Sequence, residues 1–470
     1  MNAVRAISVS LGVMAACLAG CKLAPAPDRD EVAQQALPDT TEIRSDWAGD
    51  AQDTGHVDDG WIRSFNDPQL EALVAEALEN NLNLRLAATQ VERAAGLARL
   101  AAASLKPTIA FNADLGSQTA GRSILGQDLF SGDTYGAVLG MGWEMDVWGK
   151  LRARARAGEE ALAATQADFE FARQSLAAAT SRIWFLATES RQQLALTEEA
   201  VEIFGQLLRL AETKHEVGQV SIADVHLAGG NLAAAENAVR SARSANEQIL
   251  RGLEVLLGRY PSAEIEAADE FIPLPPPVPV GVPADIISRR LDLIAAERRV
   301  AAAFFLAEEA RLARLPSFTI TGAAGLTSLT NEIAQLSAGM FAPLYTGGAL
   351  ESLVDIANAD QQAAIAAYGL TLLNAFREVE NALVNEKLFA EREQFLETSL
   401  AENEGALRVG REQYEVGRIA LLSVLQIQTR VLGAESALIR VRNERRTQRI
   451  NLHLALGGSF EAGADEGGTP

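Results

Sequence analysis

The chain has 470 residues, and its 62 Asp and Glu against 41 Lys and Arg give a formal net charge of −21. Such an acidic excess argues against a nucleic-acid-binding protein, because phosphates are bound by a basic surface. It fits a solvated periplasmic or extracellular surface instead. The length allows more than one domain.

The N-terminus has the pattern of a targeting segment. Arg5 is the only basic residue before an apolar stretch over residues 6–16, which is too short to span a bilayer as a helix. The sequence LAGC at Leu18–Cys21 follows and resembles the bacterial lipobox, in which cleavage precedes a cysteine that takes a lipid. We expect a cleaved signal peptide over 1–20 and an acyl (palmitate) anchor on Cys21. The alternative is an ordinary signal peptide followed by an incidental cysteine.

The two cysteines leave no thiol for other chemistry. Cleavage removes Cys17 and acylation consumes Cys21, so the mature chain is expected to have neither a disulfide nor a cysteine-based metal site. Lys22 after the anchor, in place of Asp, favours sorting to the outer membrane by resemblance to known sorting rules. No later segment offers about 20 uninterrupted apolar residues, so no transmembrane helix is expected.

Two long stretches without proline predict long helices. Residues 108–260 and 344–469 contain no proline and are rich in Ala, Leu, Glu, Gln and Arg, which favour helix. Apolar residues recur every seven positions, which is the spacing of a coiled-coil seam. They are Leu162, Phe169, Leu176 and Ile183 in the first stretch, and Val424, Val431 and Leu438 beside Leu425, Leu432 and Ile439 in the second. Two adjacent seams on one helix indicate neighbours on two sides.

Short strand signals come in two pairs. Pro107–Gly116 pairs with Tyr135–Trp148, and Pro316–Ser328 pairs with Ile333–Tyr345. Each segment alternates in part between apolar and polar residues and contains small residues, so each pair predicts a β-hairpin.

The two halves of the chain repeat. Leu82 and Leu291 begin matching motifs 209 positions apart, and the glycines Gly218 and Gly417 lie in matching EVG motifs 199 positions apart. One repeat is therefore a helix, a hairpin, a helix of about 70 residues, a glycine turn and a second helix of about 40. The first of these long helices would reach roughly 100 Å at about 1.5 Å per residue, which suits a tube that spans the periplasm.

Proline and glycine content divide the chain further. The proline-rich run from Phe271 to Pro283 is typical of a stiff linker, and the end of the chain is rich in Gly and Asp. We expect a signal peptide at 1–20, an extended lipidated arm at 21–60, repeat one at 61–260, a linker at 261–283, repeat two at 284–457 and a disordered tail at 458–470.

Four strands are too few to close a membrane barrel. Small membrane barrels need about eight strands, and open strand edges are not tolerated in lipid. Cyclic copies of one chain are the usual solution. We therefore expect a mainly α fold with a small membrane β part, assembled as a homotrimer. Its 12-stranded β-barrel would be continuous with a long α-helical coiled-coil tunnel.

Several motifs, in order and at the repeat spacing, resemble the outer membrane factor family of TolC-like efflux and secretion ducts. They are Trp61-x3-Phe65-x-Asp67-x2-Leu70 with ALENN at Ala77–Asn81, GWEMDVWGKLR at Gly142–Arg152, APLYTGG at Ala342–Gly348 and AFREVENAL at Ala375–Leu383. The match covers nearly the whole mature chain, and the lipobox is similar to the family's lipoprotein branch.

This resemblance implies a passive exit duct in the outer membrane of a Gram-negative bacterium, with a long periplasmic part. The partners it implies are two further copies of the chain, outer-membrane lipid, a periplasmic adaptor (membrane fusion) protein and an inner-membrane pump. The motifs do not name the cargo or the class of pump. The alternative is a lipid-anchored periplasmic coiled-coil spacer without a pore, which would need no set of four strands.

The resemblance also assigns the two glycine turns. Glycine supplies the positive φ that a tight turn between antiparallel helices needs. In the family these turns are the tips that dock the adaptor; the alternative is a plain turn between two helices. The tip residues are Val217, Gly218 and Gln219 in repeat one and Val416, Gly417 and Arg418 in repeat two.

By position in the family, the periplasmic gate lies just beyond the tips. Asp224 and Tyr414 match an acidic–aromatic pair that hydrogen-bonds between neighbouring hairpins when the duct is shut; the alternative for Asp224 is a solvated carboxylate. The family's arginine latch falls on Ile419, and its lumenal acid rings fall on Ser423 and Gln426. The ring would be neutral here, so we expect a closed state held by fewer charge contacts.

The junctions between strands and long helices carry glycines. Gly149, Gly347 and Gly348 are expected to let the chain bend there. Trp143 and Trp148 either lie at a membrane interface or pack inside the protein.

No motif indicates catalysis. The four histidines His56, His215, His226 and His453 are scattered, and no nucleophile triad, phosphate loop or HExxH sequence occurs. We expect no enzyme activity, no cofactor and no metal.

Overall fold

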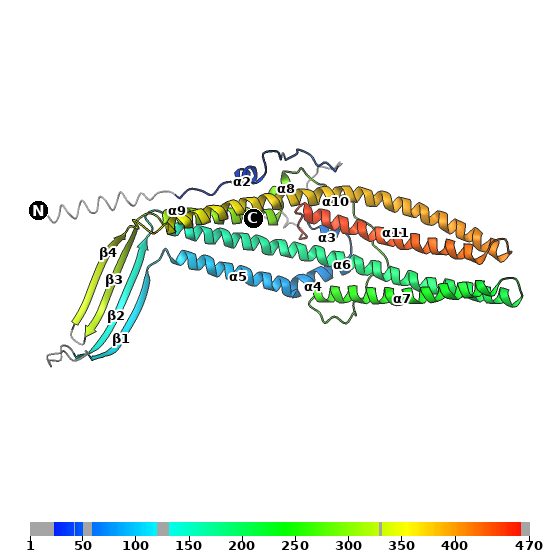
Figure 1. Ribbon diagram of the computed structural model, residues 1–470, viewed down its shortest axis with the longest axis horizontal. Helices are drawn as coiled ribbons and strands as arrows, with labels where there is room; N and C mark the ends of the chain where they lie inside the picture. Colours follow the sequence, from blue (N-terminus) through cyan, green and yellow to red (C-terminus); the bar gives the residue numbers. More distant parts are fainter. Residues whose placement is uncertain (1–22, 42, 50–58, 120–130, 329–330, 462–470) are drawn as a thin grey trace, which may run out of the picture. The chain divides into compact units, whose positions relative to one another are not determined.

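The computed structural model describes residues 23–41, 43–49, 59–119, 131–328 and 331–461 (Figure 1). Cys21 and the signal peptide lie outside these residues. The predicted mainly helical fold with two repeats of helices and a hairpin is confirmed. Among the described helices, none combines the length and the apolar content needed to cross a membrane.

The two repeats have the same elements in the same order. Repeat one contains α3 (Trp61–Ser64), α4 (Pro68–Asn80), α5 (Leu82–Ala103), β1 (Thr108–Thr119), β2 (Ser131–Met145), α6 (Lys150–Glu216) and α7 (Ile222–Leu256). Repeat two contains α8 (Asp285–Arg289), α9 (Leu291–Leu312), β3 (Ser317–Ser328), β4 (Asn331–Phe341), α10 (Ala349–Glu415) and α11 (Leu421–Ala455). Helices α6 and α10 have 67 residues each, and α7 and α11 have 35 each, so each long helix of repeat one has the same length as its counterpart in repeat two.

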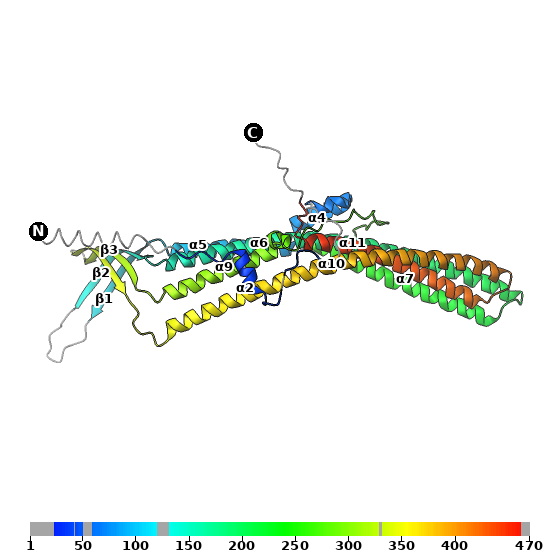
Figure 2. The same ribbon diagram turned by 90° about the horizontal axis from the view of Figure 1, so that it is seen from above.

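The chain divides into two compact units, and each takes segments from both repeats. Unit 1 comprises 1–41, 89–168 and 292–371, and unit 2 comprises 42–88, 169–291 and 372–470. Unit 1 holds the sheet, whose four antiparallel strands lie in the order β1-β2-β3-β4. In unit 2, α7 folds back along the end of α6 and α11 folds back along the end of α10 (Figures 1 and 2).

The two helical hairpins share a core near their turns. The seven-residue spacing places its apolar residues there: Val424 and Leu425 are buried and Leu432 is half-buried. The buried members of this core are Ala200, Phe204, Leu207 and Ala211 of α6, Ala228 and Ala235 of α7, Leu407 and Tyr414 of α10, and Leu421, Val424, Leu425 and Val431 of α11. We call this set the tip core.

A second core of unit 2 surrounds two aromatic side chains of α6, Trp184 and Phe185. The indole N–H of Trp184 donates to the carboxylate of Asp67 at 2.8 Å. That carboxylate also accepts the N–H groups of Gln69 and Leu70, so it begins helix α4 as an N-cap. One buried acid thus fixes both a helix start and a core indole.

The N-terminal arm was predicted to be extended, and for part of its length this was wrong. It contains helix α2 (Arg29–Ala36), which begins with a capping box because Asp28 accepts the N–H of Glu31 and Glu31 accepts the N–H of Asp28. The pair was visible in the sequence as D-x-x-E. Arg29 then pairs with Glu297 of α9 at 2.7 Å, which ties the arm to repeat two.

The tail was predicted to be disordered from residue 458, and for its first four residues this was wrong. Residues 458–461 make specific contacts: Ser459 donates its N–H to Asp59 at 2.9 Å, and Glu461 pairs with Arg173 of α6 at 2.6 Å. These contacts hold the start of the tail against unit 2. The remaining residues of the tail lie outside the described part of the chain.

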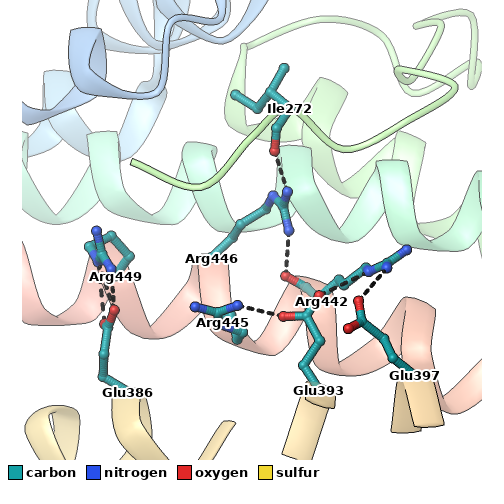
Figure 3. Close-up of polar contacts among 8 residues, drawn as sticks. All are labelled: Ile272, Glu386, Glu393, Glu397, Arg442, Arg445, Arg446 and Arg449. Carbon is teal, nitrogen blue, oxygen red and sulfur yellow. Dashed lines mark hydrogen bonds and ion pairs between the residues drawn. The ribbon is translucent and has the colours of Figure 1, made fainter. Parts of the chain in front are cut away.

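Arginines of α11 hold the proline-rich linker. Proline has a carbonyl but no N–H, so such a segment needs outside donors for its carbonyls. Arg449 donates to the carbonyls of Pro275 and Pro276 and to the carboxylate of Glu386 on α10. Arg446 donates to the carbonyl of Ile272 (Figure 3). We call Arg446 and Arg449 the linker clamp.

The clamp is buried and supported by its neighbours. The guanidinium of Arg446 lies 4.4 Å from the ring centroid of Phe271, and burial lowers the pKa of Arg446 to about 10. Arg442 and Arg445 both pair with Glu393 of α10, at 3.0 and 2.5 Å. Burial tends to raise the pKa of Glu393, but hydrogen bonds and charge from the two arginines outweigh it, so its pKa is lowered. Arginines of α11, themselves paired with acids of α10, therefore hold the linker in place.

Candidate functional site: an amphipathic sheet and two helical tips

One face of the sheet is mostly apolar across all four strands, with Glu332, opposite Leu326, as a charged exception. Residues opposite each other in the register point to the same side, so the pair Phe111 and Leu139 shares a face with the pair Gly322 and Leu336. The larger apolar residues of this face are Ile109, Phe111, Leu115, Leu139, Met141, Trp143, Phe318, Ile320, Leu326, Leu336 and Met340. Leu115 is 84% exposed and Leu336 is 77% exposed. A single chain leaves this face uncovered.

The opposite face is mostly polar or small. Its polar residues are Thr108, Asn112, Asp114, Glu144, Ser317, Thr319, Thr321, Gln335 and Ser337, and its small residues are Ala110, Gly136, Gly140, Gly142, Ala323, Gly325 and Gly339. Val138, Ile333 and Phe341 are the larger apolar exceptions. The strands therefore alternate between an apolar and a polar face, as the strands of membrane barrels do.

The sheet has two free edges. Strand β1 pairs only with β2, and β4 pairs only with β3, within the part of the chain that the structure describes. The outer backbone N–H and C=O groups of β1 and β4 therefore lack a strand partner in this chain. Such edges pair readily with another strand.

The predicted junction residues lie where strands pass into long helices. Gly149 has φ +93°, Gly347 has φ +64° and Gly348 has φ +86°, a region that favours glycine. After β2, the carboxylate of Asp146 accepts the N–H groups of Leu151 and Arg152 at 2.9 and 3.0 Å. This acid offsets the partial positive charge at the start of α6.

Both junction tryptophans use their indole N–H inside the protein. Trp143 donates to the carbonyl of Leu105 at 3.1 Å, and Trp148 donates to the carbonyl of Pro316 at 2.7 Å. Each bond ties the base of the β2 region to the segment before another strand. Both tryptophans are half-buried, and a place at the membrane interface stays a prediction.

The two tips have the same backbone geometry. Gly218 has φ +74°, its N–H donates to the carbonyl of His215, and the next N–H, of Gln219, donates to Lys214 at 2.8 Å. Gly417 has φ +76° and repeats both bonds one repeat later. This is the Schellman ending, which satisfies the last carbonyls of a helix.

The predicted docking residues are exposed at these turns. Val217 is 66% exposed and Val416 is 68% exposed, and the glycines, Gln219 and Arg418 beside them are also exposed. Each tip therefore presents an exposed valine side chain next to the exposed backbone of a glycine.

The predicted gate residues are brought near each other but are not joined within this chain. Asp224 lies in the first turn of α7, where its carboxylate accepts the N–H and the hydroxyl of Ser221 at 3.1 and 3.2 Å. Tyr414 is only 3% exposed, and its hydroxyl has no hydrogen-bond partner among the described residues. Burial raises the pKa of the Tyr414 phenol, and the charge of Asp224 raises it further.

The other two gate positions are neutral, as the sequence shows. Ser423 is half-buried and Gln426 is exposed. Ser423 is the repeat-two counterpart of Asp224, 199 positions later. The capping carboxylate of tip one therefore has no counterpart in tip two.

Sequence reasoning missed Lys214, which links the two hairpins. Its Nζ donates to the carbonyl of Tyr414 at 2.8 Å and to that of Glu415 at 3.1 Å. The same Nζ lies 4.4 Å from the ring centroid of Tyr414. The available signal was indirect: the last turn of α10 has no basic residue of its own.

Comparison with known proteins gives consistent matches over nearly the whole chain. Residues 73–259 and 282–458 match the family model described as outer membrane efflux protein. The chain is 28% identical to the antibiotic efflux pump outer membrane protein ArpC of Pseudomonas putida, with 96% of this chain and 95% of ArpC covered. It is 30% identical to the probable efflux pump outer membrane protein SepC of Pseudomonas putida (strain ATCC 700007 / DSM 6899 / JCM 31910 / BCRC 17059 / LMG 24140 / F1), with 97% of each covered.

The solved structures agree on the fold. The outer-membrane channel OprN superposes on this chain with a TM-score of 0.84 at 22% identity, and the match covers 94% of this chain and 100% of that one.

Proposed function

The chain belongs to the outer membrane efflux protein family, whose members are passive outer membrane channels and not enzymes, and we propose that three copies of it form one exit duct. The apolar face of the sheet would meet lipid, and the polar face would line the lumen. Each copy would contribute one third of the barrel wall.

The amphipathic sheet with two free edges carries this proposal. Lipid offers no hydrogen bonds, so the edges of β1 and β4 must be paired. If β4 of one copy pairs with β1 of the next, every backbone group on the ring is satisfied. Two copies would make eight strands, whose interior is filled by side chains, whereas three copies make twelve and leave a wider lumen. The small and polar residues of the inner face support an open passage.

The helical hairpins give the duct its periplasmic part. We assign the tip residues Val217, Gly218, Gln219, Val416, Gly417 and Arg418 to contact with a periplasmic adaptor, since exposed apolar side chains lie beside open backbone there. An inner-membrane pump would supply the energy. Asp224, Tyr414, Ser423 and Gln426 would form the gate, and the single acid among them implies few charge contacts in the closed state.

A lipid anchor would add a second hold on the outer membrane. The lipobox supports cleavage after residue 20 and acylation of Cys21, with a palmitate chain in the leaflet. The competing function is a lipid-anchored periplasmic spacer, which would depend on this anchor alone. In the duct, by contrast, the barrel would keep the protein in the membrane without the anchor.

Removal of the anchor separates the two functions. In Cys21→Ser, expressed behind a signal peptide that an ordinary signal peptidase cleaves, we expect the protein to stay in the outer-membrane fraction. It should run as a trimer band that heating dissociates. Palmitate labelling should be lost in this variant.

The matched control is Cys17→Ser behind the native leader, which removes the other cysteine and should keep palmitate labelling. A soluble periplasmic monomer from Cys21→Ser would overturn the duct and support the spacer. Retained palmitate in Cys21→Ser would overturn the anchor alone.

A further inference from the structure

The ends of the two longest helices differ in charge. The last turn of α6 contains Lys214 and His215, whereas the last turn of α10 contains no basic residue. The carbonyls at a helix C-terminus carry partial negative charge, which a nearby cation stabilises. Glu412 and Glu415 close α10 with the opposite sign. The last turn of α10 therefore contains no basic side chain to stabilise its terminal carbonyls.

Lys214 of hairpin one supplies that cation to hairpin two. Its Nζ contacts two terminal carbonyls of α10, those of Tyr414 and Glu415, at 2.8 and 3.1 Å. A charged donor makes these bonds stronger than neutral ones. The ammonium also lies 4.4 Å from the centroid of the Tyr414 ring, within range of a cation–π contact. One half-buried side chain thus holds both the backbone and the ring of Tyr414.

The starts of α7 and α11 also differ, because side chains bond at the start of α7 and not at the start of α11. At tip one, Ser221 and Asp224 close the start of α7 with side-chain bonds. At tip two, Ala420 begins α11 without a side-chain cap, and Ser423 stands where Asp224 stands in tip one. Tip one is closed by its own residues on both sides, while two of the last carbonyls of α10 accept a charged side-chain donor from tip one.

The link runs in one direction only. The repeat-two counterpart of Lys214 is Gln413, 199 positions later, which carries no charge to return to α6. When Lys214 is replaced, the end of α6 keeps His215, whose ring contacts the carbonyl of Val220 at 3.0 Å within tip one. Loss of the link is therefore expected to loosen hairpin two and leave hairpin one unchanged.

We propose that Lys214 is a positioning residue of the periplasmic gate, which holds the tip of hairpin two, and Tyr414 within it, against hairpin one of the same chain. The inference rests on the proposed duct and adds a residue to its closing mechanism. Release of this one contact frees the end of α10 and lets the buried Tyr414 leave the tip core. Opening then begins with hairpin two.

The test uses Lys214→Met, which keeps the apolar stem and removes the charge, in the full-length protein in detergent. Amide hydrogen exchange should be about tenfold faster over 414–418 and unchanged over 215–219, because only tip two loses a tertiary contact. Lys214→Arg should restore most of the protection. The control Gln413→Met changes the equivalent position of the other repeat and should leave both tips as in the wild type.

A second readout concerns the gate. In planar bilayers, Lys214→Met should raise the ratio of open to closed time about tenfold, and Gln413→Met should not. Exchange that stays at the wild-type rate over 414–418, or rises equally at both tips, would overturn the link. Faster exchange with unchanged gating would overturn its role in the gate. Wild-type protein that forms no channels would instead contradict the proposed duct, and the exchange result would still judge the link.

Discussion

Arg449→Met is expected to lower the free energy of unfolding by about 3 kcal/mol, the lower end of the range for breaking a buried ion pair. The side chain of Arg449 is 2% exposed. It pairs with the carboxylate of Glu386 and donates hydrogen bonds to the carbonyls of Pro275 and Pro276. Methionine fills part of the space but donates no hydrogen bond. The prolines of the linker have no N–H to offer, and methionine leaves the carbonyls of Pro275 and Pro276 without this donor.

Chemical unfolding followed by tryptophan fluorescence measures this loss, and limited proteolysis of the linker gives a local readout. The control is Arg445→Met, because Arg445 is partly exposed and its partner Glu393 keeps Arg442; we expect a loss below about 1 kcal/mol. The double variant Arg449→Met, Glu386→Leu should recover part of the loss, since no unpaired carboxylate remains. Equal losses for the two arginines would contradict the linker clamp.

Leu336→Arg is expected to abolish assembly in the outer membrane. Leu336 lies in the middle of β4, on the apolar face and opposite Gly322. An arginine facing lipid costs about 2–4 kcal/mol at the bilayer midplane, and a trimer would bear this cost three times. The variant should be depleted from outer-membrane trimers and should fail to restore export in cells that lack the wild-type protein.

The neighbouring residue provides the control. Gln335→Arg places the same charge one position earlier, on the polar face, where it would enter the lumen. We expect normal amounts of trimer for this variant. If Leu336→Arg assembled as well as Gln335→Arg, the apolar face could not be the lipid-facing side of a barrel. A spacer without a barrel would tolerate both.

The sequence predicted the long elements well because their signals are local. The proline-free runs, the seven-residue spacing around Val424 and Val431, and the glycines at 218 and 417 each act within a few residues of the chain. Equal offsets between these landmarks predicted the repeat. The alternation of the strand segments predicted a sheet, and the antiparallel register then showed which residues share each face.

The linker clamp and the Lys214 link escaped prediction because their partners are distant in the chain. Arg449 binds a carbonyl 174 positions away, and Lys214 binds one 200 positions away. An arginine in a charged helix is usually solvated, and nothing near Arg449 in the sequence marks it as buried. For Lys214, only the missing cation in the last turn of α10 pointed to a partner.

The sequence around Asp224 indicates a helix cap, whereas the residue was interpreted as part of the gate. Its place three residues after Ser221 is the spacing of a capping box, and in the structure its carboxylate accepts the N–H and the hydroxyl of Ser221. Family position alone suggested the gate. The same carboxylate raises the pKa of Tyr414, so capping places the acid where a gate would need it.

Single-channel recording of the purified trimer in planar bilayers tests the proposed duct most directly. We predict discrete ion-conducting steps without any nucleotide or partner protein, with short openings in the wild type and longer ones in Asp224→Ala. Unchanged conductance and closed lifetimes in Asp224→Ala would remove that residue from the gate. Trimers that insert into the bilayer and leave it non-conducting, in the wild type and in Asp224→Ala alike, would contradict the exit duct itself.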